Sequence, residues 1–392
     1  MNSSGWIKYK LEDLADFHDS KRIPLNTRER ETRKGTFPYY GASGIVDYID
    51  DYIFDGEYVL ISEDGENLRS RTTPIAFKAN GKFWVNNHAH VIQGKEQFLN
   101  DWIVYFFQNL DLNPYITGAV QPKLNRENLQ LIEIPMPDIE KAKKIVSILS
   151  ALDDKIELNR QTNATLEAIA QAIFKEWFVD FNFPGSTGEL VESDLGMIPK
   201  GWRVGSVADI LVLANETMSP GVNPDKLFNH YSISAFDSGR IPSQEPGSTI
   251  LSNKYKVKSN SILVSKLNPR IPRIWTLKEV DQESSICSTE FQVLLPQKAH
   301  YYSFAANLFS KPSIIDTMKS RASGTSSSHQ RINPQDILDI NIIIPTDDLL
   351  ALFDKIVGDN YHCVINGLEE SINLAKIRDS LLPKLMNGEI RI

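Results

Sequence analysis

The sequence predicts an α+β fold made by duplication. Two mixed α/β domains, related by a pseudo-two-fold, are joined by two long helices packed as an antiparallel coiled coil. The passage VQPKLNRENLQLIEIPMP at 120–137 returns as SHQRINPQDILDINIIIP at 328–345, an offset of 208 residues. Each copy ends in a proline, and a long helical pattern follows each of them. A repeat of this length indicates a duplicated domain-sized unit and is too long for a solenoid.

Each half of the chain shows the same succession of features. A tryptophan opens a short amphipathic run, WIKYKLEDLADF in the first half and WRVGSVADILVL in the second. Strand-like runs separated by Gly, Pro and Asn follow, among them EYVLIS, KFWVNNHAHVI, NSILVSKL and EFQVLLP. The predicted divisions are a first domain at 1–137, a first helix at 138–180, a connecting loop at 181–200, a second domain at 201–345 and a second helix at 346–392.

The helical patterns predict the seam along which the two helices pair. In the first helix the members alternate at spacings of four and three: Ile145, Leu149, Leu152, Ile156, Asn159, Asn163, Leu166, Ala170, Ile173 and Trp177. The second seam is less regular: Phe353, Ile356, Asn360, Val364, Leu374, Ile377 and Leu381, with an interruption at Gly367, Glu370 and Ser371 and end signals at Pro383 and Gly388. A central asparagine layer usually fixes register and partner. The alternative is that the two helices belong to two separate domain cores.

The composition is that of a globular chain, with 41% hydrophobic and 23% charged residues. The sequence contains no run of 18 apolar residues and no signal-peptide pattern, so we expect no membrane span. Two cysteines, Cys287 and Cys363, provide no disulfide framework. We therefore expect a cytoplasmic protein.

Local charge differs from the net charge of −8. Residues 246–278 contain seven Lys and Arg and no Asp or Glu, and residues 65–95 contain five Lys and Arg against Glu66 alone. Lys and Arg attract phosphates, and the interleaved Asn, Gln, Ser and Thr are side chains that read base edges. Each half therefore carries a predicted nucleic-acid surface. The alternative is an ordinary solvated basic face.

Motifs for chemistry are absent from the sequence. The pair His88 and His90 has no Cys or carboxylate at ligand spacing, which argues against a metal site. The segment SGTSSSH has a serine and a histidine but no nucleophile elbow. The sequence holds neither a phosphate-binding loop nor the Asn-Pro-Pro-aromatic motif of adenine methyltransferases. We expect a binding protein with no catalytic residue and no metal ligand.

The ordered set of motifs resembles the specificity (S) subunits of type I restriction-modification systems, from residue 6 to residue 392. The segments that carry the resemblance are GWIKYKLEDLADF, KFWVNNHAHVI, QPKLNRENLQLIEIPMP, KEWFVDFNFP, ESDLGMIPKGWRVGSVADI, VSKLNPRI, CSTEFQVLLP, INPQDILDINIIIP and RDSLLPKLMNGEI. Single segments are moderately specific, and their order is highly specific. The interrupted seam of the second helix departs from the family's pattern.

The resemblance implies that each domain is a target-recognition domain reading one half of a bipartite, asymmetric DNA site, and that the helices set the unread spacer. It implies double-stranded DNA, two methyltransferase (M) subunits and motor-endonuclease (R) subunits as partners. This chain would hold no cofactor, while the partner subunits use S-adenosylmethionine, ATP and Mg for adenine-N6 methylation and restriction. The alternative function is a scaffold or decoy specificity protein that binds methyltransferase subunits without reading DNA.

We select DNA-contact candidates from the basic segments and the repeated passage. In the first half they are Arg69, Arg71, Asn86, Asn87, His88, His90, Gln121 and Lys123. In the second half they are Lys254, Lys256, Lys258, Lys266, Asn268, Arg270, Arg273, Ser326, Ser327, Ser328, His329, Gln330 and Arg331.

Overall fold

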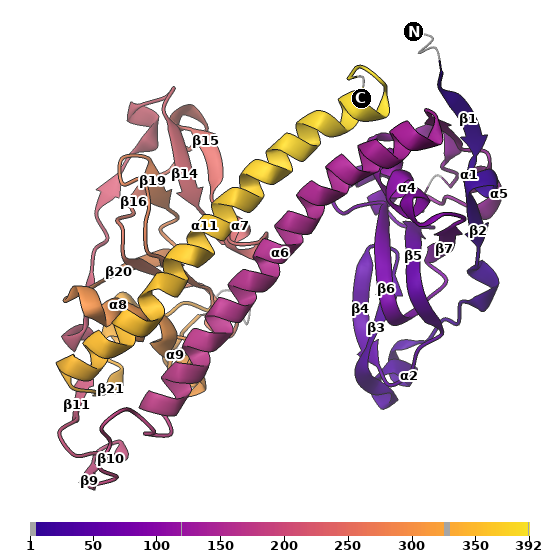
Figure 1. Ribbon diagram of the computed structural model, residues 1–392. Helices are drawn as coiled ribbons and strands as arrows, with labels where there is room; N and C mark the ends of the chain where they lie inside the picture. Colours follow the sequence, from indigo (N-terminus) through magenta and orange to yellow (C-terminus); the bar gives the residue numbers. More distant parts are fainter. Residues whose placement is uncertain (1–4, 119, 325–329, 391) are drawn as a thin grey trace. The chain divides into compact units, whose positions relative to one another are not determined.

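The computed structural model describes residues 5–118, 120–324, 330–390 and 392, and it divides into two compact units (Figure 1). Unit 1 comprises residues 1–156 and 372–392, and unit 2 comprises residues 157–371. The long helices α6 (Ile139–Phe178) and α11 (Asp347–Met386) each contribute one part to each unit. No helix in the described part of the chain has the length and apolarity needed to cross a membrane.

Unit 1 is built on a six-stranded sheet in the order β2-β7-β5-β6-β3-β4 among its described residues. Its strands are β1 (Ile7–Lys10), β2 (Ala15–Phe17), β3 (Lys34–Gly41), β4 (Gly44–Ile49), β5 (Phe54–Ser62), β6 (Ala76–Val85), β7 (Ala89–Gly94) and β8 (Glu133–Met136). Its shorter helices are α1 (Leu11–Leu14), η1 (Asp19–Lys21), α2 (Thr27–Thr32), α3 (Asn67–Ser70), α4 (Gln97–Asn109), η2 (Asn113–Tyr115) and α5 (Arg126–Gln130).

Unit 2 contains a four-stranded sheet, β12-β20-β17-β18, and a five-stranded sheet, β13-β16-β19-β14-β15, in its described residues. Its strands are β9 (Leu190–Ser193), β10 (Gly196–Pro199), β11 (Arg203–Ser206), β12 (Leu211–Leu213), β13 (Thr217–Met218), β14 (Leu227–Tyr231), β15 (Ser243–Pro246), β16 (Lys254–Lys256), β17 (Ser261–Ser265), β18 (Ile274–Leu277), β19 (Ser285–Cys287), β20 (Phe291–Pro296) and β21 (Asn341–Ile344). Its shorter helices are η3 (Val207–Asp209), η4 (Pro220–Val222), α7 (Ile233–Asp237), η5 (Gly247–Thr249), η6 (Ala299–Tyr301), α8 (Tyr302–Leu308), α9 (Pro312–Arg321) and α10 (Pro334–Leu338).

The two units share one strand arrangement. In unit 1, β2, β7, β5 and β6 are antiparallel neighbours in that order, and β12, β20, β17 and β18 have the same order and directions in unit 2. The strand after each opening tryptophan pairs with the strand made by the repeated passage, β1 with β8 and β11 with β21. The sequence repeat is therefore a repeat of structure.

The repeated passage folds into the same two elements in both copies. It forms a short helix, α5 or α10, and then a strand, β8 or β21, that ends before the proline at 137 or 345. In the first copy Asn125 caps α5, because its Oδ1 accepts a hydrogen bond from the backbone N–H of Asn128 at 2.8 Å. Asp138 then caps α6 by accepting from the backbone N–H of Lys141 at 3.1 Å.

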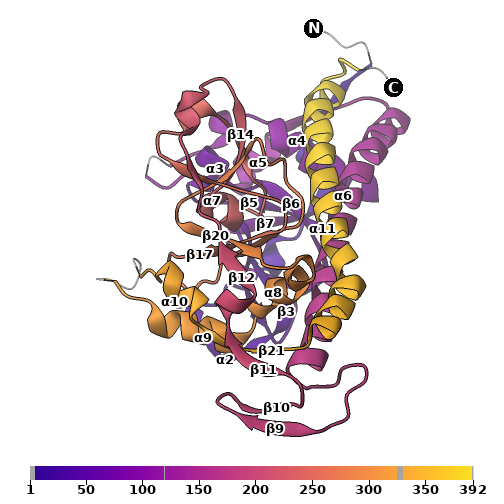
Figure 2. The same ribbon diagram turned by 90° about the vertical axis from the view of Figure 1, so that its left-hand side faces the viewer.

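The units differ in the segment between the first and third strands of the shared arrangement. Unit 1 inserts α2, β3 and β4 there, whereas unit 2 inserts α7 and most of its five-stranded sheet. The segment expected as a connecting loop carries an antiparallel hairpin, β9–β10, which projects beyond β11 and β21 in Figure 2. The shared strands thus form the constant part of both units, and the inserted segments differ between them.

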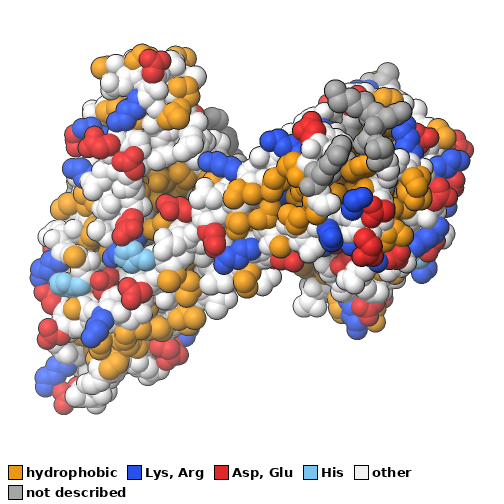
Figure 3. All heavy atoms as spheres, turned by 45° about the horizontal axis from the view of Figure 1, so that its top comes forward, with side chains coloured by type: hydrophobic (Ala, Val, Ile, Leu, Met, Phe, Trp, Pro, Cys, Tyr) orange, Lys and Arg blue, Asp and Glu red, His pale blue; other side chains and the backbone are white. Residues whose placement is uncertain are grey.

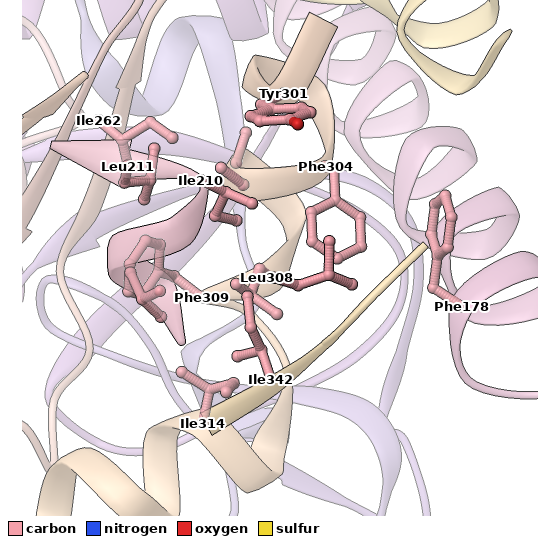
Figure 4. Packing of buried hydrophobic residues seen from close by; sticks show 14 of the residues in the cluster. Phe178, Ile210, Leu211, Ile262, Tyr301, Phe304, Leu308, Phe309, Ile314 and Ile342 are labelled. Carbon is pink, nitrogen blue, oxygen red and sulfur yellow. The ribbon is translucent and has the colours of Figure 1, made fainter. Parts of the chain in front are cut away.

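Both long helices take part in the core of each unit. In unit 2, Phe178 of α6 packs on Phe304 of α8, with ring centroids 5.0 Å apart (Figure 4). It packs on Phe353 of α11 at the same centroid distance, 5.0 Å. In unit 1, Leu149 of α6 and Leu385 of α11 belong to one buried cluster with Trp102 of α4. Burying such side chains contributes about 1.5–3 kcal/mol each. Neither unit is complete without a part of each helix.

An asparagine layer joins the two helices inside unit 2. The side-chain amide of Asn159 donates to Glu370 Oε2 at 2.8 Å, and that of Asn163 donates to the backbone carbonyl of Val364 at 3.2 Å. From α11, the amide of Asn360 donates to the carbonyl of Leu166 at 3.4 Å. Rising residue numbers on α6 meet falling numbers on α11, so the two helices run antiparallel within this unit.

The seam of α11 differs from the one expected. The helix is continuous through Gly367 and Ser371, and these residues lie in the seam rather than interrupting it, since Ser371 Oγ lies 3.3 Å from the Asn159 amide. Val357 is fully buried, whereas Ile356 is 45% exposed. The corrected seam is Phe353, Val357, Asn360, Val364, Gly367, Ser371, Leu374, Arg378 and Leu381. It keeps the alternation of four and three throughout.

In unit 1 the seam includes a charged contact. Arg378 of α11 donates to Asp153 of α6 at 2.6 Å, and the hydroxyl of Tyr105 donates to the same carboxylate at 2.7 Å. Burial raises the pKa of Tyr105, and its hydrogen bond to Asp153 adds to that rise. The helix continues past Pro383, which the sequence marks as an end signal, to Met386. Because proline has no backbone N–H, the helix lacks the hydrogen bond that residue 383 would otherwise donate to the carbonyl of Asp379.

Two glycines of α11 provide a matched test of the seam. A Cβ on Gly367 would lie 2.7 Å from Oδ1 of Asn163, whereas a Cβ on Gly358 would meet nothing nearer than 3.7 Å. We expect Gly358→Ala to stabilise the chain by up to about 1 kcal/mol through helix propensity. Gly367→Ala should destabilise it by on the order of 1–3 kcal/mol through overpacking. Urea denaturation measures both, and equal shifts would show that the seam does not need a glycine at 367.

Candidate nucleic-acid interface

Several candidates of unit 1 gather where the central strand β5 ends. Residues 122–124 pair with the residues after β5, because the backbone N–H of Leu124 donates to the carbonyl oxygen of Glu63 at 2.7 Å. This places the Lys123 ammonium 3.3 Å from the Glu63 carboxylate. His88 lies beside the same strand end, with Nδ1 2.9 Å from both carboxylate oxygens of Asp64. Lys123 and His88 are about half exposed, so a polyanion can reach both.

His90, by contrast, is part of the buried structure. Its side chain is 1% exposed, Nδ1 lies 2.7 Å from Asp19, and Nε2 lies 2.8 Å from the carbonyl oxygen of Leu124. Burial alone raises the pKa of the Asp19 carboxyl, but the hydrogen bonds from His90 and Val91 and the nearby Arg22 lower it below its ordinary value. Since both ring nitrogens of His90 are occupied, we leave this residue out of the interface.

Some of the other unit 1 candidates make side-chain hydrogen bonds within the unit, and others are exposed. Arg69 donates to the carbonyl of Gly118 at 3.0 Å. Arg71 has a left-handed backbone (φ 51°) and donates to carbonyls at the end of α4, 2.6 Å to Phe107. Arg71 therefore caps a helix C-terminus, where a cation is favourable. Asn86 accepts from the backbone N–H of His88 at 2.8 Å, and the side chains of Asn87 and Gln121 are exposed.

In unit 2 the corresponding strand end, after β17, gathers a second group. The backbone N–H of Asn268 donates to the carbonyl of Gln330 at 2.7 Å, and Lys266 accepts from Ile332 at 3.1 Å. Arg331 makes a two-pronged ion pair with Glu290, at 2.9 and 3.0 Å. These four candidates, Lys266, Asn268, Gln330 and Arg331, are thus brought together from segments more than 60 residues apart in the sequence.

The basic segment of unit 2 carries less free charge than the sequence count suggests. Lys256 and Lys258 share the carboxylate of Glu216, at 2.6 and 3.6 Å. Arg273 pairs with Asp237 at 2.7 Å. Counting residues along the segment omits these acids because the fold brings them from outside it. In the space-filling view, Lys and Arg side chains accordingly lie among Asp and Glu side chains on the face shown (Figure 3).

Six further candidates of unit 2 remain, of which the structure describes two. Lys254 is 8% exposed and donates to Ser252 Oγ at 2.6 Å, and burial lowers the pKa of its ammonium group. Arg270 is exposed. The candidates Ser326, Ser327, Ser328 and His329 lie outside the described residues. No cluster of three or more His, Cys, Asp or Glu side chains suited to a metal ion occurs within the described residues.

Sequence reasoning missed the acidic residues of both strand ends. Glu63, Asp64 and Glu290 hold candidate cations or imidazoles, but positive charge in the sequence does not indicate which acids the fold brings beside it. The repeat marks the cations that these acids hold, and not the acids themselves. The offset of 208 aligns Lys123 with Arg331, and each directly precedes a buried apolar residue that anchors the segment, Leu124 or Ile332.

Comparison with known proteins gives one consistent result. Residues 3–168 match the model of the type I restriction modification DNA specificity domain. The chain is 27% identical to the MjaIX specificity subunit of Methanocaldococcus jannaschii, a type I restriction enzyme subunit, over 99% of this chain and 94% of that one. It is 26% identical to the type I HindI specificity subunit of Haemophilus influenzae, over 86% of this chain and 84% of that one.

A solved structure shares the fold. The S subunit of the type I restriction-modification system of M. genitalium superposes with a TM-score of 0.60 at 14% identity, over 98% of this chain and 97% of that one. The family model, the full-length relatives and the duplicated fold agree. Over almost its whole length, the chain is similar to the specificity subunits of type I restriction-modification systems.

Proposed function

We propose that this chain is a specificity subunit that reads a bipartite DNA site, with one half-site read by each unit. The observation that carries the proposal is the pair of equivalent strand ends, which present a cation to solvent at Lys123 in unit 1 and at Arg331 in unit 2. Phosphate contacts would position the duplex, and base contacts would specify the sequence. Because the inserted segments differ between the units, the two half-sites would differ, and the whole site would be asymmetric.

In this proposal residues 1–137 and 201–345 are the target-recognition domains, and residues 181–200 connect the halves. The helices at 138–180 and 346–392 form an antiparallel coiled coil that sets the unread spacer. Two weak readers on a stiff spacer gain affinity through effective concentration when the spacing of half-sites fits. The asparagine layer supports this role, since a buried asparagine commonly specifies helix register.

The seam also supports a pseudo-two-fold relation between the halves. Under the offset of 208, the residue equivalent to Asn159 is Gly367. These two residues touch, with the Asn159 amide 3.4 Å from the Gly367 carbonyl oxygen. In an antiparallel pair related by a two-fold, equivalent residues meet only where the axis crosses the seam. A two-fold axis through the Asn159–Gly367 contact therefore fits both the repeat and the register.

Two equivalent apolar surfaces suit two copies of one partner. Ile148 and Ile377 in unit 1 are 40% and 48% exposed, and Ile169 and Ile356 in unit 2 are each 45% exposed. The offset of 208 relates Ile148 to Ile356 and Ile169 to Ile377. Each residue directly precedes a seam residue, so all four occupy the same heptad position. We assign these surfaces to two methyltransferase subunits, which would supply adenine-N6 methylation with S-adenosylmethionine. Motor-endonuclease subunits would add ATP- and Mg-dependent restriction.

Introducing negative charge on one apolar surface should remove one methyltransferase subunit. We expect Ile148→Glu with Ile377→Glu to reduce the bound methyltransferase subunits from two to one, because a carboxylate cannot be desolvated cheaply in an apolar contact. Ile169→Glu with Ile356→Glu should give the same stoichiometry, and all four changes together should abolish binding. Native mass spectrometry of the co-expressed complex measures this. Leu251→Glu, at a side chain 95% exposed outside both helices, is the control. Two retained subunits in every variant would contradict the assignment.

A methylation map tests the reading of DNA. The chain is expressed with its methyltransferase subunit in a methylation-free host, and modified adenines are identified by long-read sequencing. We expect a bipartite motif with a fixed gap and one methyladenine on each strand.

A stable complex that methylates no motif would favour the alternative, a scaffold or decoy specificity protein. A gel-shift titration in salt separates the two functions. A reader loses affinity steeply as salt rises, with a slope of about −0.9 per phosphate contact, and a scaffold shows no salt-sensitive DNA binding.

A further inference from the structure

The end of the central strand carries the same hydrogen-bonded framework in both units. In unit 1 the bonds are Glu63 N to His88 O (2.9 Å), Leu124 N to Glu63 O (2.7 Å), Gly65 N to Pro122 O (3.0 Å) and a reciprocal pair between Thr117 and Lys123 (2.8 Å each). In unit 2 they are Lys266 N to Glu290 O (2.8 Å), Ile332 N to Lys266 O (3.1 Å), Asn268 N to Gln330 O (2.7 Å) and a reciprocal pair between Ser323 and Arg331 (3.0 and 2.9 Å). We call this set of bonds the strand-end framework.

The framework defines equivalent residues from backbone geometry alone. Lys123 is equivalent to Arg331, because each exchanges two hydrogen bonds with its neighbouring segment. The turn residue after the strand is Gly65 in unit 1 and Asn268 in unit 2. Both have positive φ, 108° and 52°, a conformation that Gly and Asn adopt most readily. The two frameworks therefore share one hydrogen-bond pattern and a residue of positive φ at the same place in the turn.

Side chains on the framework fall into one constant position and two exchanged ones. The constant position is a cation, Lys123 or Arg331. The position at the strand exit is an acid in unit 1, Glu63, and a base in unit 2, Lys266. The facing position is His88 in unit 1 and an acid, Glu290, in unit 2.

The cation accordingly finds its acid in a different place in each unit. Lys123 pairs with the strand-exit Glu63 at 3.3 Å, and Arg331 pairs with the facing Glu290 at 2.9 Å. In unit 2 the residue at the strand exit is the base Lys266, and its Nζ lies 5.9 Å from the centroid of the Tyr255 ring. The two units share the backbone bonds of the framework but carry different charges on it. Two readers of different sequences require this, because the pattern of donors and acceptors changes while the positions of these groups do not.

We propose that the strand-end framework is the common reading head of both units, and that its cation, strand-exit and facing positions determine which bases each half-site contains. This inference rests on the proposed function. Lys123 and Arg331 contact a guanine edge in their own half-site, since Lys and Arg donate to guanine O6 and N7. Glu63 and Glu290 are positioning residues that orient these cations.

Side-chain exposure fits these roles. The side chains of Lys123 and Arg331 are 50% and 53% exposed, so they can reach a groove. Those of Glu63 and Glu290 are 13% and 30% exposed, so they act from behind the cations. Removing such an acid leaves the cation in place but frees its orientation. The expected effect is a relaxed base preference rather than loss of binding.

The test compares methylation maps of single variants in the assembled complex with the map of the unchanged chain. We expect Lys123→Gln to lose the guanine preference at one position of one half-site by about tenfold, and to leave the other half-site intact. Arg331→Gln should do the same in the other half-site. Glu290→Gln should relax the position that Arg331→Gln alters. A merely structural role would lower methylation everywhere without changing any base.

Matched controls are available in each unit. Lys8 pairs with Glu133 at 2.8 Å and Arg203 pairs with Asp209 at 3.1 Å, and all four side chains are at least 40% exposed. Lys8→Gln and Arg203→Gln therefore break comparable ion pairs outside the framework and should leave the motif unchanged.

The outcomes separate this inference from the function on which it rests. If the unchanged chain yields no bipartite motif, the proposed function fails. If it yields a motif that Lys123→Gln and Arg331→Gln leave unchanged, the reading head is overturned and the function stands. Should Arg331→Gln abolish all methylation, Arg331→Lys keeps the charge and is expected to restore methylation with a relaxed base. No methylation by Arg331→Lys, while the methyltransferase still co-purifies, would also overturn the reading head.

Discussion

The pairing of α6 with α11 is the constraint on which both units depend. The largest buried cluster of each unit includes residues from both helices, so neither globular part is closed by its own half of the sequence. At the middle of the seam the contact is polar, through Asn159, Asn163 and the backbone of α11. Each such hydrogen bond contributes only about 1 kcal/mol net, but leaving an amide buried and unpaired costs about 1–3 kcal/mol. A slipped register would incur that penalty, so the polar layer selects one register more strongly than an apolar seam would.

The strand-end framework likewise combines a constant backbone with variable side chains. Its backbone hydrogen bonds recur in both units, while the residues between the shared strands differ in length and topology. A backbone frame is indifferent to side-chain identity, which allows charges to be exchanged at fixed points in space. Under the proposed function, duplication of such a frame would give the chain two readers that can diverge in what they recognise, while both keep the same connection to their helices and offer equivalent surfaces to a partner.

The sequence predicted the duplication and the first helix seam because both depend on local pattern. Heptad spacing is a property of successive residues, and α6 follows it without a break. The predicted seam of α11 is wrong at Ile356 and at Gly367. A count of apolar residues selects the exposed Ile356 and treats Gly367 as a gap. Only the position of Asn163, opposite Gly367, shows why a residue without Cβ belongs there.

Charge was harder to predict for a related reason. Glu216 and Asp237 lie outside the basic segment in sequence and beside it in space. His88 and His90 look alike in the sequence, yet one is exposed at a strand end and the other is buried on the following strand. Ion pairs and burial depend on the tertiary fold, so no reading of a local window can supply them.

Site-directed cross-linking tests most directly whether each framework faces its own half-site. Cys363 is exposed and is replaced by serine, while Cys287 is buried and is kept. A single cysteine at Gln121 or at Ser323 then carries a short photo-cross-linker in the complex bound to its methylation site. We expect the probe at 121 to attach to one half-site and the probe at 323 to the other, with the spacer unlabelled between them. Attachment of both probes to the same half-site, or to the spacer, would contradict it.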